Sequence, residues 1–321
     1  MKKISIIIPA YNEEEALPAL MERITKFADD TKDYDFEFLF VNDGSKDRTI
    51  ELIKEYREKD KRVCYVDFAR NFGKETAMKA GIDYATGDAV VFLDADLQDP
   101  PEIITEMIKY WEEGYDDVYA QRKSRKGETW MKKFTSKMYY KVLQDLTNVP
   151  IQKDTGDFRL LDRRCVNALK VMNESQRNSK SMFSWIGYKK KAIFYDRDPR
   201  VAGKTKWNYS KLINLAIDGI TSFTTSPLRI STFIAIPTFL VLFVYFVYVI
   251  AKSFIVHQPI QAFQATILLI LFFSGIQIML FGIVGEYLGR IFNETKNRPL
   301  YLVNEYNGEK ENNEKLLSKD K

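Results

Sequence analysis

Two long runs without charged side chains, near the C-terminal end, constrain this chain more than any other feature. Ile230 to Ala251 carries no formal charge, and neither does Ser253 to Gly285 apart from the titratable His257. Each run is long enough to cross a bilayer as a helix, since about 20 apolar residues span the hydrocarbon core. Two buried core helices are the alternative, but a polar domain of this size has no interior to hide them. We therefore expect two membrane spans, at about 230–251 and 263–285.

The connection between the two runs predicts their topology. The apolar pattern is interrupted by Lys252, His257, Gln258 and Pro259, which predict a tight connection, so the spans should form a hairpin with both ends on one side. Lys and Arg residues are frequent before Ile230 and recur after the second span. By the positive-inside rule this side is the cytoplasm.

The rest of the chain has the composition of an ordinary soluble domain. The net charge of +4 is too small to indicate a nucleic-acid partner. Cys64 and Cys165 lack C-x-x-C spacing, which excludes a disulfide framework and a thiolate metal site. Because His257 is the only histidine, carboxylates must supply any metal ligands in the N-terminal region.

Short apolar runs alternate with helix-like periodicity along the N-terminal part. This alternation predicts an α/β fold, a mostly parallel Rossmann-like sheet with helices on its faces. Ligands of such sheets gather at the carboxyl ends of the strands, so the loops beginning at Pro9, Asn42, Asp94 and Gln121 should share one crevice. The predicted strands are Ile4–Ile8, Phe36–Val41, Val63–Asp67, Ala89–Leu93 and Val118–Ala120.

Two stretches have the pattern of helices that lie on a membrane surface. Apolar residues recur every four positions from Trp130 to Leu146 beside a lysine stripe, although a core-facing helix fits that pattern equally well. Leu212 to Phe223 is a second candidate. From Glu305 the chain is polar and should be disordered. The expected organisation is a catalytic domain at 1–209, an interfacial helix at 210–228, the two spans within 229–290, and a partly disordered cytoplasmic tail at 291–321.

The segment after the fourth predicted strand is a candidate metal site. Asp94 and Asp96, one residue apart at a strand end, can converge on a hard divalent cation that also binds a diphosphate. Gln98 offers another oxygen, and Asp99 is placed to cap the next helix. Asp-x-Asp occurs twice more in this chain, but only the Asp94 pair lies at the end of a central strand.

The turn Asn42-Asp43-Gly44-Ser45 follows the second predicted strand. Taken alone, it is typical of a turn and helix cap, with Ser45 as the N-cap. Together with the other motifs, its position predicts that Asp43 lies in the crevice.

Three motifs in combination resemble the inverting family 2 glycosyltransferases. They are Pro9-Ala10-Tyr11-Asn12-Glu13-Glu14, Val41-Asn42-Asp43-Gly44-Ser45 and Asp94-Ala95-Asp96-Leu97-Gln98-Asp99-Pro100-Pro101. A fourth run, Asp154-Thr155-Gly156-Asp157-Phe158-Arg159-Leu160, is similar to the polyprenyl-phosphate branch of that family, which includes dolichol-phosphate mannose synthases and bacterial bactoprenol glucosyltransferases. The resemblance covers nearly the whole chain, because the bacterial members also end in two membrane helices. It implies the GT-A form of the α/β fold.

The resemblance implies roles for individual residues of this chain. The nucleotide sugar would be held by Pro9, Tyr11, Glu13, Asp43, Asp94, Ala95 and Asp96. The metal, Mg²⁺ or Mn²⁺, would be bound by Asp94, Asp96 and Gln98. Phosphates of donor or acceptor would be bound by Arg122, Arg200 and Lys206, although Arg122 alone could be a solvated surface charge.

Asp157 matches the residue that some bacterial members use as the proposed catalytic base. A phosphate monoester has its second pKa near 6, so at neutral pH the acceptor is already largely a nucleophilic dianion. A proton acceptor is therefore less necessary than for a sugar hydroxyl. We expect Asp157 to orient the acceptor or a basic partner as much as to abstract a proton.

The implied activity is transfer of a sugar to undecaprenyl phosphate with inversion, at the cytoplasmic face of a bacterial inner membrane. UDP-glucose is the expected donor, but these residues do not separate it from UDP-N-acetylglucosamine, UDP-galactose or a GDP-sugar. A processive polysaccharide synthase would carry a Gln-x-x-Arg-Trp motif, which is missing here. A non-catalytic sugar-nucleotide-binding scaffold is the alternative from another class. A homo-oligomer, either dimer or tetramer, is left open.

Overall fold

The computed structural model describes residues 1–122, 155–175, 177–196, 244 and 262–310. The chain divides into two compact units. Residues Met1–Leu215 together with Arg298–Lys321 form the first, and Ala216–Asn297 form the second.

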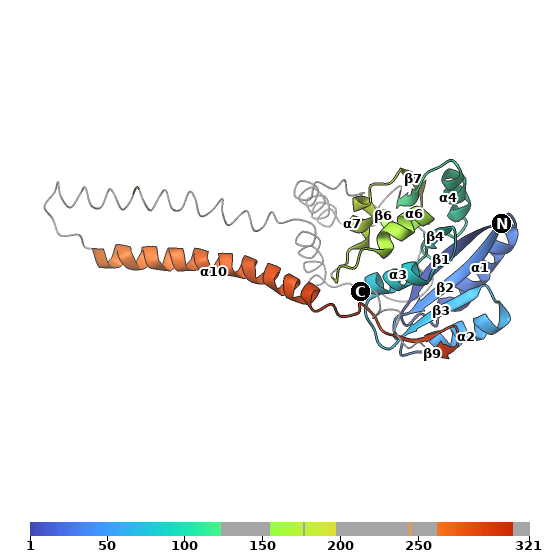
Figure 1. Cartoon of the computed structure of the whole chain (residues 1–321), viewed down its shortest axis with the longest axis horizontal. Helices are drawn as coiled ribbons and strands as arrows, with labels where there is room; N and C mark the ends of the chain where they lie inside the picture. The colour runs from blue at the N-terminus through green and yellow to red at the C-terminus, as the bar shows by residue number, and fades with distance from the viewer. Residues whose placement is uncertain (123–154, 176, 197–243, 245–261, 311–321) are drawn as a thin grey trace. The chain divides into compact units, whose positions relative to one another are not determined.

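Within the described residues, the first unit contains a nine-stranded sheet (Figure 1). Its spatial order is β7-β5-β6-β4-β1-β2-β3-β8-β9. The strands are β1 Lys2–Ala10, β2 Tyr34–Asn42, β3 Val63–Phe68, β4 Ala89–Phe92, β5 Asp117–Arg122, β6 Thr155–Asp162, β7 Lys190–Tyr195, β8 Val303–Tyr306 and β9 Glu309–Lys310.

The predicted α/β sheet is confirmed, and all five predicted strands are present. β1 pairs in parallel with β2 and β4, and β2 pairs in parallel with β3. The register places Ile4, Ile6 and Ile8 beside Phe36, Phe38 and Phe40, and all six side chains are buried in one core cluster. Alternation in β1 therefore divides its apolar residues between the two covered faces of the sheet.

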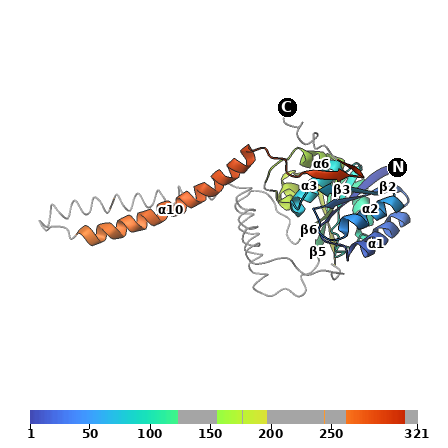
Figure 2. The same ribbon diagram turned by 90° about the horizontal axis from the view of Figure 1, so that it is seen from below.

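Helices cover both faces of this sheet (Figure 2). On one face the core cluster includes residues of α1 (Leu17–Asp30), α2 (Thr49–Lys59) and α4 (Ile103–Glu112). The other face carries α3 (Lys74–Tyr84), α6 (Arg163–Lys170) and α7 (Ser179–Trp185). α3 packs closely, because a Cβ on its Gly81 would collide with Ile7 of β1.

Four strands of the described sheet, β6, β7, β8 and β9, were not predicted from the apolar pattern. β6 runs antiparallel between β4 and β5, so its first residues lie beside the carboxyl ends of those strands. β8 pairs antiparallel with β3. The structure thus differs from the expectation of disorder from Glu305 onward, because β8 and β9 complete the edge of the sheet up to Lys310; residues 311–321 lie outside the described part.

The second unit is described mainly through α10 (Ala262–Thr295). The second predicted span, 263–285, falls on this helix. The first, 230–251, lies outside the described residues except for Val244, and so do both predicted interfacial helices. Within the described residues, no helix has the combined length and apolarity that crossing a membrane requires.

Tyr301 tests whether the C-terminal segment is part of the core. Its ring is buried and stacks on Phe68 with centroids 5.1 Å apart, and its hydroxyl donates to Asp83 Oδ2 at 2.9 Å. We expect Tyr301→Ala to lower the free energy of unfolding by about 3–5 kcal/mol, the usual cost of removing a large buried ring. The neighbouring, exposed Leu302 is the control, and Leu302→Ala should cost about 1 kcal/mol or less. Urea unfolding followed by tryptophan fluorescence measures both, and equal small losses would contradict the assignment.

Candidate functional site

The functional edge is formed where the parallel strands end and β6 begins. Phe92, the last residue of β4, pairs with Arg159 of the antiparallel β6. Two residues beyond this pair in each strand are Asp94 and Asp157. The topology therefore brings the predicted metal ligand and the predicted acceptor residue together, although 63 positions separate them in the sequence.

Lys74, the first residue of α3, joins these two carboxylates. Its Nζ lies 2.6 Å from Oδ1 and 2.8 Å from Oδ2 of Asp94, and 2.8 Å from Oδ2 of Asp157. The three side chains differ in exposure, at 45% for Lys74, 29% for Asp94 and 15% for Asp157. The Lys74 ammonium thus contacts both the more exposed carboxylate, Asp94, and the more buried one, Asp157.

The charges of this cluster stabilise one another. Burial alone would raise the pKa of Asp157, but the ammonium groups of Lys74 and Lys180 hold it well below its usual range. Burial likewise opposes the charge on Lys74, yet Asp157 and Asp94 hold the pKa of Lys74 above its usual range. Asp157 is therefore a carboxylate at neutral pH. Its buried Oδ1 has no hydrogen-bond partner among the described residues, which leaves one oxygen able to accept a bond from a ligand.

Glu75, the second residue of α3, ties the helix to α7. Its Oε2 accepts a hydrogen bond from Ser179 N at 2.8 Å and another from the Ser179 hydroxyl. Burial raises the pKa of Glu75, and the nearby Asp157 raises it further. The first turn of α3 is therefore held by contacts of both of its charged residues, Lys74 and Glu75.

Asp43 holds the loop that leads into α3. Its Oδ1 accepts from Phe72 N at 2.6 Å, and its Oδ2 accepts from Gly73 N and Asn71 Nδ2, both at 2.9 Å. Burial raises the pKa of Asp43 although these bonds oppose the rise. The carboxylate thus sets the position of the residues immediately before Lys74. Its expected contact with the nucleotide stays a proposal.

The loops after β1, β2 and β3 are fastened to one another. Asn12 N donates to Ser45 Oγ at 3.0 Å, and Lys46 N donates to Asn12 Oδ1 at 2.8 Å. Gly44, with φ of 62°, lies so close to the β3–α3 loop that a Cβ would collide with the backbone of Arg70. The expected capping role of Ser45 is wrong, since α2 begins at Thr49 and the Ser45 hydroxyl bonds to the first loop. Pro9, Tyr11 and Glu13 lie at this fastened end of β1.

Buried and partly exposed residues alternate along the segment 94–99. Ala95, Leu97 and Asp99 are buried, whereas Asp94, Asp96 and Gln98 are partly exposed. Asp96 Oδ1 accepts from Gln98 N at 3.2 Å. This oxygen-only donor set fits a hard cation such as Mg²⁺ or Mn²⁺. Among the described residues, however, no three His, Cys, Asp or Glu side chains form a metal-binding group, so water or phosphate oxygens would have to complete the coordination.

Asp99 and Arg122 meet at Tyr195, on the other face of the sheet edge. The Tyr195 hydroxyl donates to Asp99 Oδ1 and accepts from the Arg122 guanidinium. Asp99 therefore does not cap α4, whose N-cap is Glu102. The Arg122 guanidinium lies beside Gly156, and its buried Nε has no partner among the described residues. The other predicted phosphate ligands, Arg200 and Lys206, lie outside the described residues.

A buried ion pair anchors the strand that carries Asp157. Arg159 is fully buried, and its Nη1 lies 3.0 Å from Asp117 Oδ2 of β5. The guanidinium also lies 4.1 Å from the ring centroid of Phe183 in α7. Since Arg159 and Asp157 share one face of β6, this pair fixes the strand two residues from the site.

Sequence reasoning missed Lys74, Glu75 and Asn71. The signal was present, because the run Asn71-Phe72-Gly73-Lys74 follows the carboxyl end of the third predicted strand. Ligand sites form at such strand ends, so this loop belongs with those that begin at Pro9, Asn42, Asp94 and Gln121.

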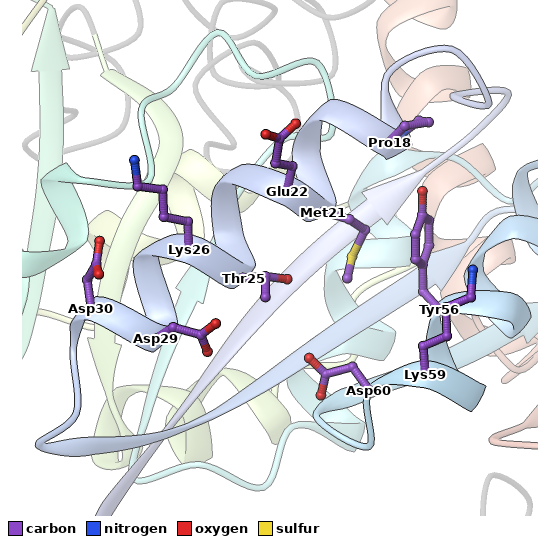
Figure 3. Close-up of a pocket in the computed structure, with 10 residues that line it drawn as sticks. All are labelled: Pro18, Met21, Glu22, Thr25, Lys26, Asp29, Asp30, Tyr56, Lys59 and Asp60. Carbon is purple, nitrogen blue, oxygen red and sulfur yellow. The ribbon is translucent and has the colours of Figure 1, made fainter.

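A hollow between α1 and α2 lies outside this site (Figure 3). Several of its lining residues, including Asp29, Asp30, Lys59 and Asp60, come from the carboxyl ends of these helices. Helices and parallel strands alternate in direction, so the carboxyl ends of the helices lie near the amino-terminal ends of the strands, away from the candidate site. None of the predicted site residues lines this hollow.

Comparison with known proteins shows the family to which this chain belongs. The profile of Glycosyl transferase family 2 matches residues 5–169. An uncharacterized glycosyltransferase of Synechocystis sp. is 46% identical over 94% of this chain and 95% of its own length. The prophage bactoprenol glucosyl transferase homolog of Escherichia coli is 42% identical over 94% and 98%, and the bactoprenol glucosyl transferase of Shigella phage SfX is 40% identical over the same shares. The chain therefore belongs to glycosyl transferase family 2 and is a glycosyltransferase.

Proposed function

We propose that this enzyme transfers glucose from UDP-glucose to undecaprenyl phosphate with inversion, and that it does so at the cytoplasmic face of a bacterial inner membrane. The product would be a polyprenyl-phosphate sugar for modification of cell-envelope glycans. The observation that carries the proposal is the ammonium of Lys74 shared by Asp94 and Asp157. A donor-binding carboxylate and an acceptor-binding carboxylate then belong to one site, as a single displacement requires.

The donor would bind along the ends of β1, β2 and β4. Pro9, Tyr11, Glu13 and Asp43 would hold the nucleotide, and Ala95 would face the diphosphate. A divalent cation held by Asp94, Asp96 and Gln98 would neutralise charge on the diphosphate as it departs. The partly exposed, oxygen-only side of segment 94–98 supports this assignment.

The acceptor would bind beside Asp157. Its phosphate is largely a dianion at neutral pH and attacks without prior proton removal. Arg122, together with Arg200 and Lys206, would hold phosphate oxygens, for which a guanidinium fork is suited. The buried Oδ1 of Asp157, which has no partner among the described residues, supports a polar ligand at this place.

A membrane location follows from the acceptor, because a long polyprenyl chain stays in the bilayer. The two uncharged runs support a hairpin anchor. In α10, large apolar side chains such as Phe263, Ile270 and Phe281 are more than half exposed, and such surfaces call for an apolar environment. The names of the prophage and phage relatives support glucose as the transferred sugar and a bactoprenol lipid as the acceptor.

Glycolipid formation tests the proposed reaction. Purified protein with undecaprenyl phosphate, Mg²⁺ and UDP-glucose should yield a new polyprenyl-phosphate hexose of inverted anomeric configuration, detected by mass spectrometry and NMR. Asp96→Asn should abolish its formation, a loss of roughly 100-fold or more, because the cation loses a charged ligand. EDTA should do the same.

Parallel reactions with UDP-N-acetylglucosamine, UDP-galactose and a GDP-sugar test the donor. The variant Asp29→Asn, at the opposite edge of the sheet, is the matched control and should keep wild-type turnover. A product with another donor alone would reject UDP-glucose. No product with any donor would reject transfer to this lipid.

The pH dependence of Asp157→Asn tests whether Asp157 orients or abstracts a proton. The lysines hold the pKa of Asp157 below its usual range, so the residue stays ionised throughout the working range. We expect turnover to fall by roughly 10- to 100-fold through misplacement, with an unchanged pH profile. Loss of an acidic limb from the profile of the variant would show that Asp157 is the base.

A further inference from the structure

Lys74 contacts Asp94, one of the residues proposed above to hold the divalent cation. Both oxygens of Asp94 lie within 2.8 Å of its ammonium. A divalent ion and an ammonium compete for the same carboxylate charge, so the ion cannot bind Asp94 at full strength while Lys74 stays there.

We propose that Lys74 competes with the divalent ion of the donor for Asp94 and stays on Asp157 when the ion binds. Lys74 would then be a positioning residue that couples donor binding to the orientation of the acceptor carboxylate. This inference rests on the proposed function, because it needs the ion at Asp94.

The geometry allows the exchange without breaking the contact to Asp157. A lysine ammonium has three donors, and one of them reaches Asp157 Oδ2 at 2.8 Å. Release of Asp94 therefore leaves that contact intact. The Asp94 end is also the more exposed end of the cluster, so this pair is held less strongly than the buried contact.

The start of α3 is fixed independently of Asp94. Asp43 holds the backbone of Phe72 and Gly73, and Glu75 is bound to Ser179. Loss of the Asp94 contact therefore leaves the backbone of Lys74 in place. What changes is the distribution of charge, since Asp157 becomes the main partner of the ammonium.

The experiment measures Mn²⁺ affinity and turnover on the full-length protein. Mn²⁺ binding is followed by electron paramagnetic resonance of the free ion, in the presence of UDP and without acceptor. We expect Lys74→Met to bind Mn²⁺ about tenfold more tightly, a change of about 1.4 kcal/mol, because the competitor is gone. Its kcat for glycolipid formation should nevertheless fall by roughly 10- to 100-fold, because Asp157 has lost its partner.

Two variants control for loss of charge and of structure. Lys74→Arg keeps the positive charge and should stay near wild type in Mn²⁺ affinity. Lys2→Met removes a lysine that pairs with Glu112 at the opposite edge, and should change neither property. Thermal melting shows that Lys74→Met is folded.

Tighter Mn²⁺ binding together with a lower kcat in Lys74→Met supports the inference. Equal or weaker Mn²⁺ affinity in Lys74→Met, unchanged turnover, or absence of Mn²⁺ binding in every protein would overturn it. The Mn²⁺ measurement needs no lipid, so it tests the inference separately from the proposed reaction. If Lys74→Met binds Mn²⁺ more tightly but the wild type forms no glycolipid, undecaprenyl phosphate is rejected as the acceptor. The competition between Lys74 and the ion for Asp94 is then still supported. If the wild type forms glycolipid but Lys74→Met binds Mn²⁺ with unaltered affinity, the proposed reaction is supported and the competition for Asp94 is rejected.

Discussion

The site depends on one ammonium held between two carboxylates. Asp94 and Asp157 reach the same edge from neighbouring strands of opposite direction, and Glu75 adds a third acidic group. Like charges this close cannot all remain ionised without a counter-charge. Lys74 supplies it, and its contacts to both aspartates turn a repulsive group into a stable one. The carboxyl end of β4 and the start of β6 are thereby linked electrostatically through Lys74.

The surrounding fold holds this ammonium in place through both ends of α3. The loop before the helix is held by Asp43. Near its other end, Asp83 accepts from Tyr301 at 2.9 Å and from the buried Lys79 at 2.7 Å. Tyr301 belongs to the segment that follows α10 in the sequence, so the chain beyond the apolar runs returns to support the helix that begins at Lys74. Removing one partner from such buried networks is costly, because the remaining charge stays desolvated.

The sequence predicted those parts of the fold that depend on apolar periodicity. The five strands with continuous apolar runs were found, whereas β6 was missed because Asp157, Arg159 and Asp162 interrupt its pattern. Asp94 and Asp157 lie together through their shared contact to Lys74, and their roles in catalysis stay predictions. The capping roles of Ser45 and Asp99 were wrong because their partners, Asn12 and Tyr195, come from distant elements. A single lysine among 48 Lys and Arg residues does not stand out by its type, so only its place after the third predicted strand could have indicated Lys74.

The electrostatics of the cluster also limit what Asp157 can do. A carboxylate whose pKa is held below its usual range is a weak proton acceptor, since the efficiency of a general base falls as its pKa departs from the working pH. A phosphate dianion needs no such base. The same ammonium that weakens Asp157 as a base keeps it charged and fixed, which suits it to orient a cationic partner of the acceptor. In the reaction proposed for this site, catalysis therefore rests on the placement of charge around the departing diphosphate and the attacking phosphate, rather than on proton transfer.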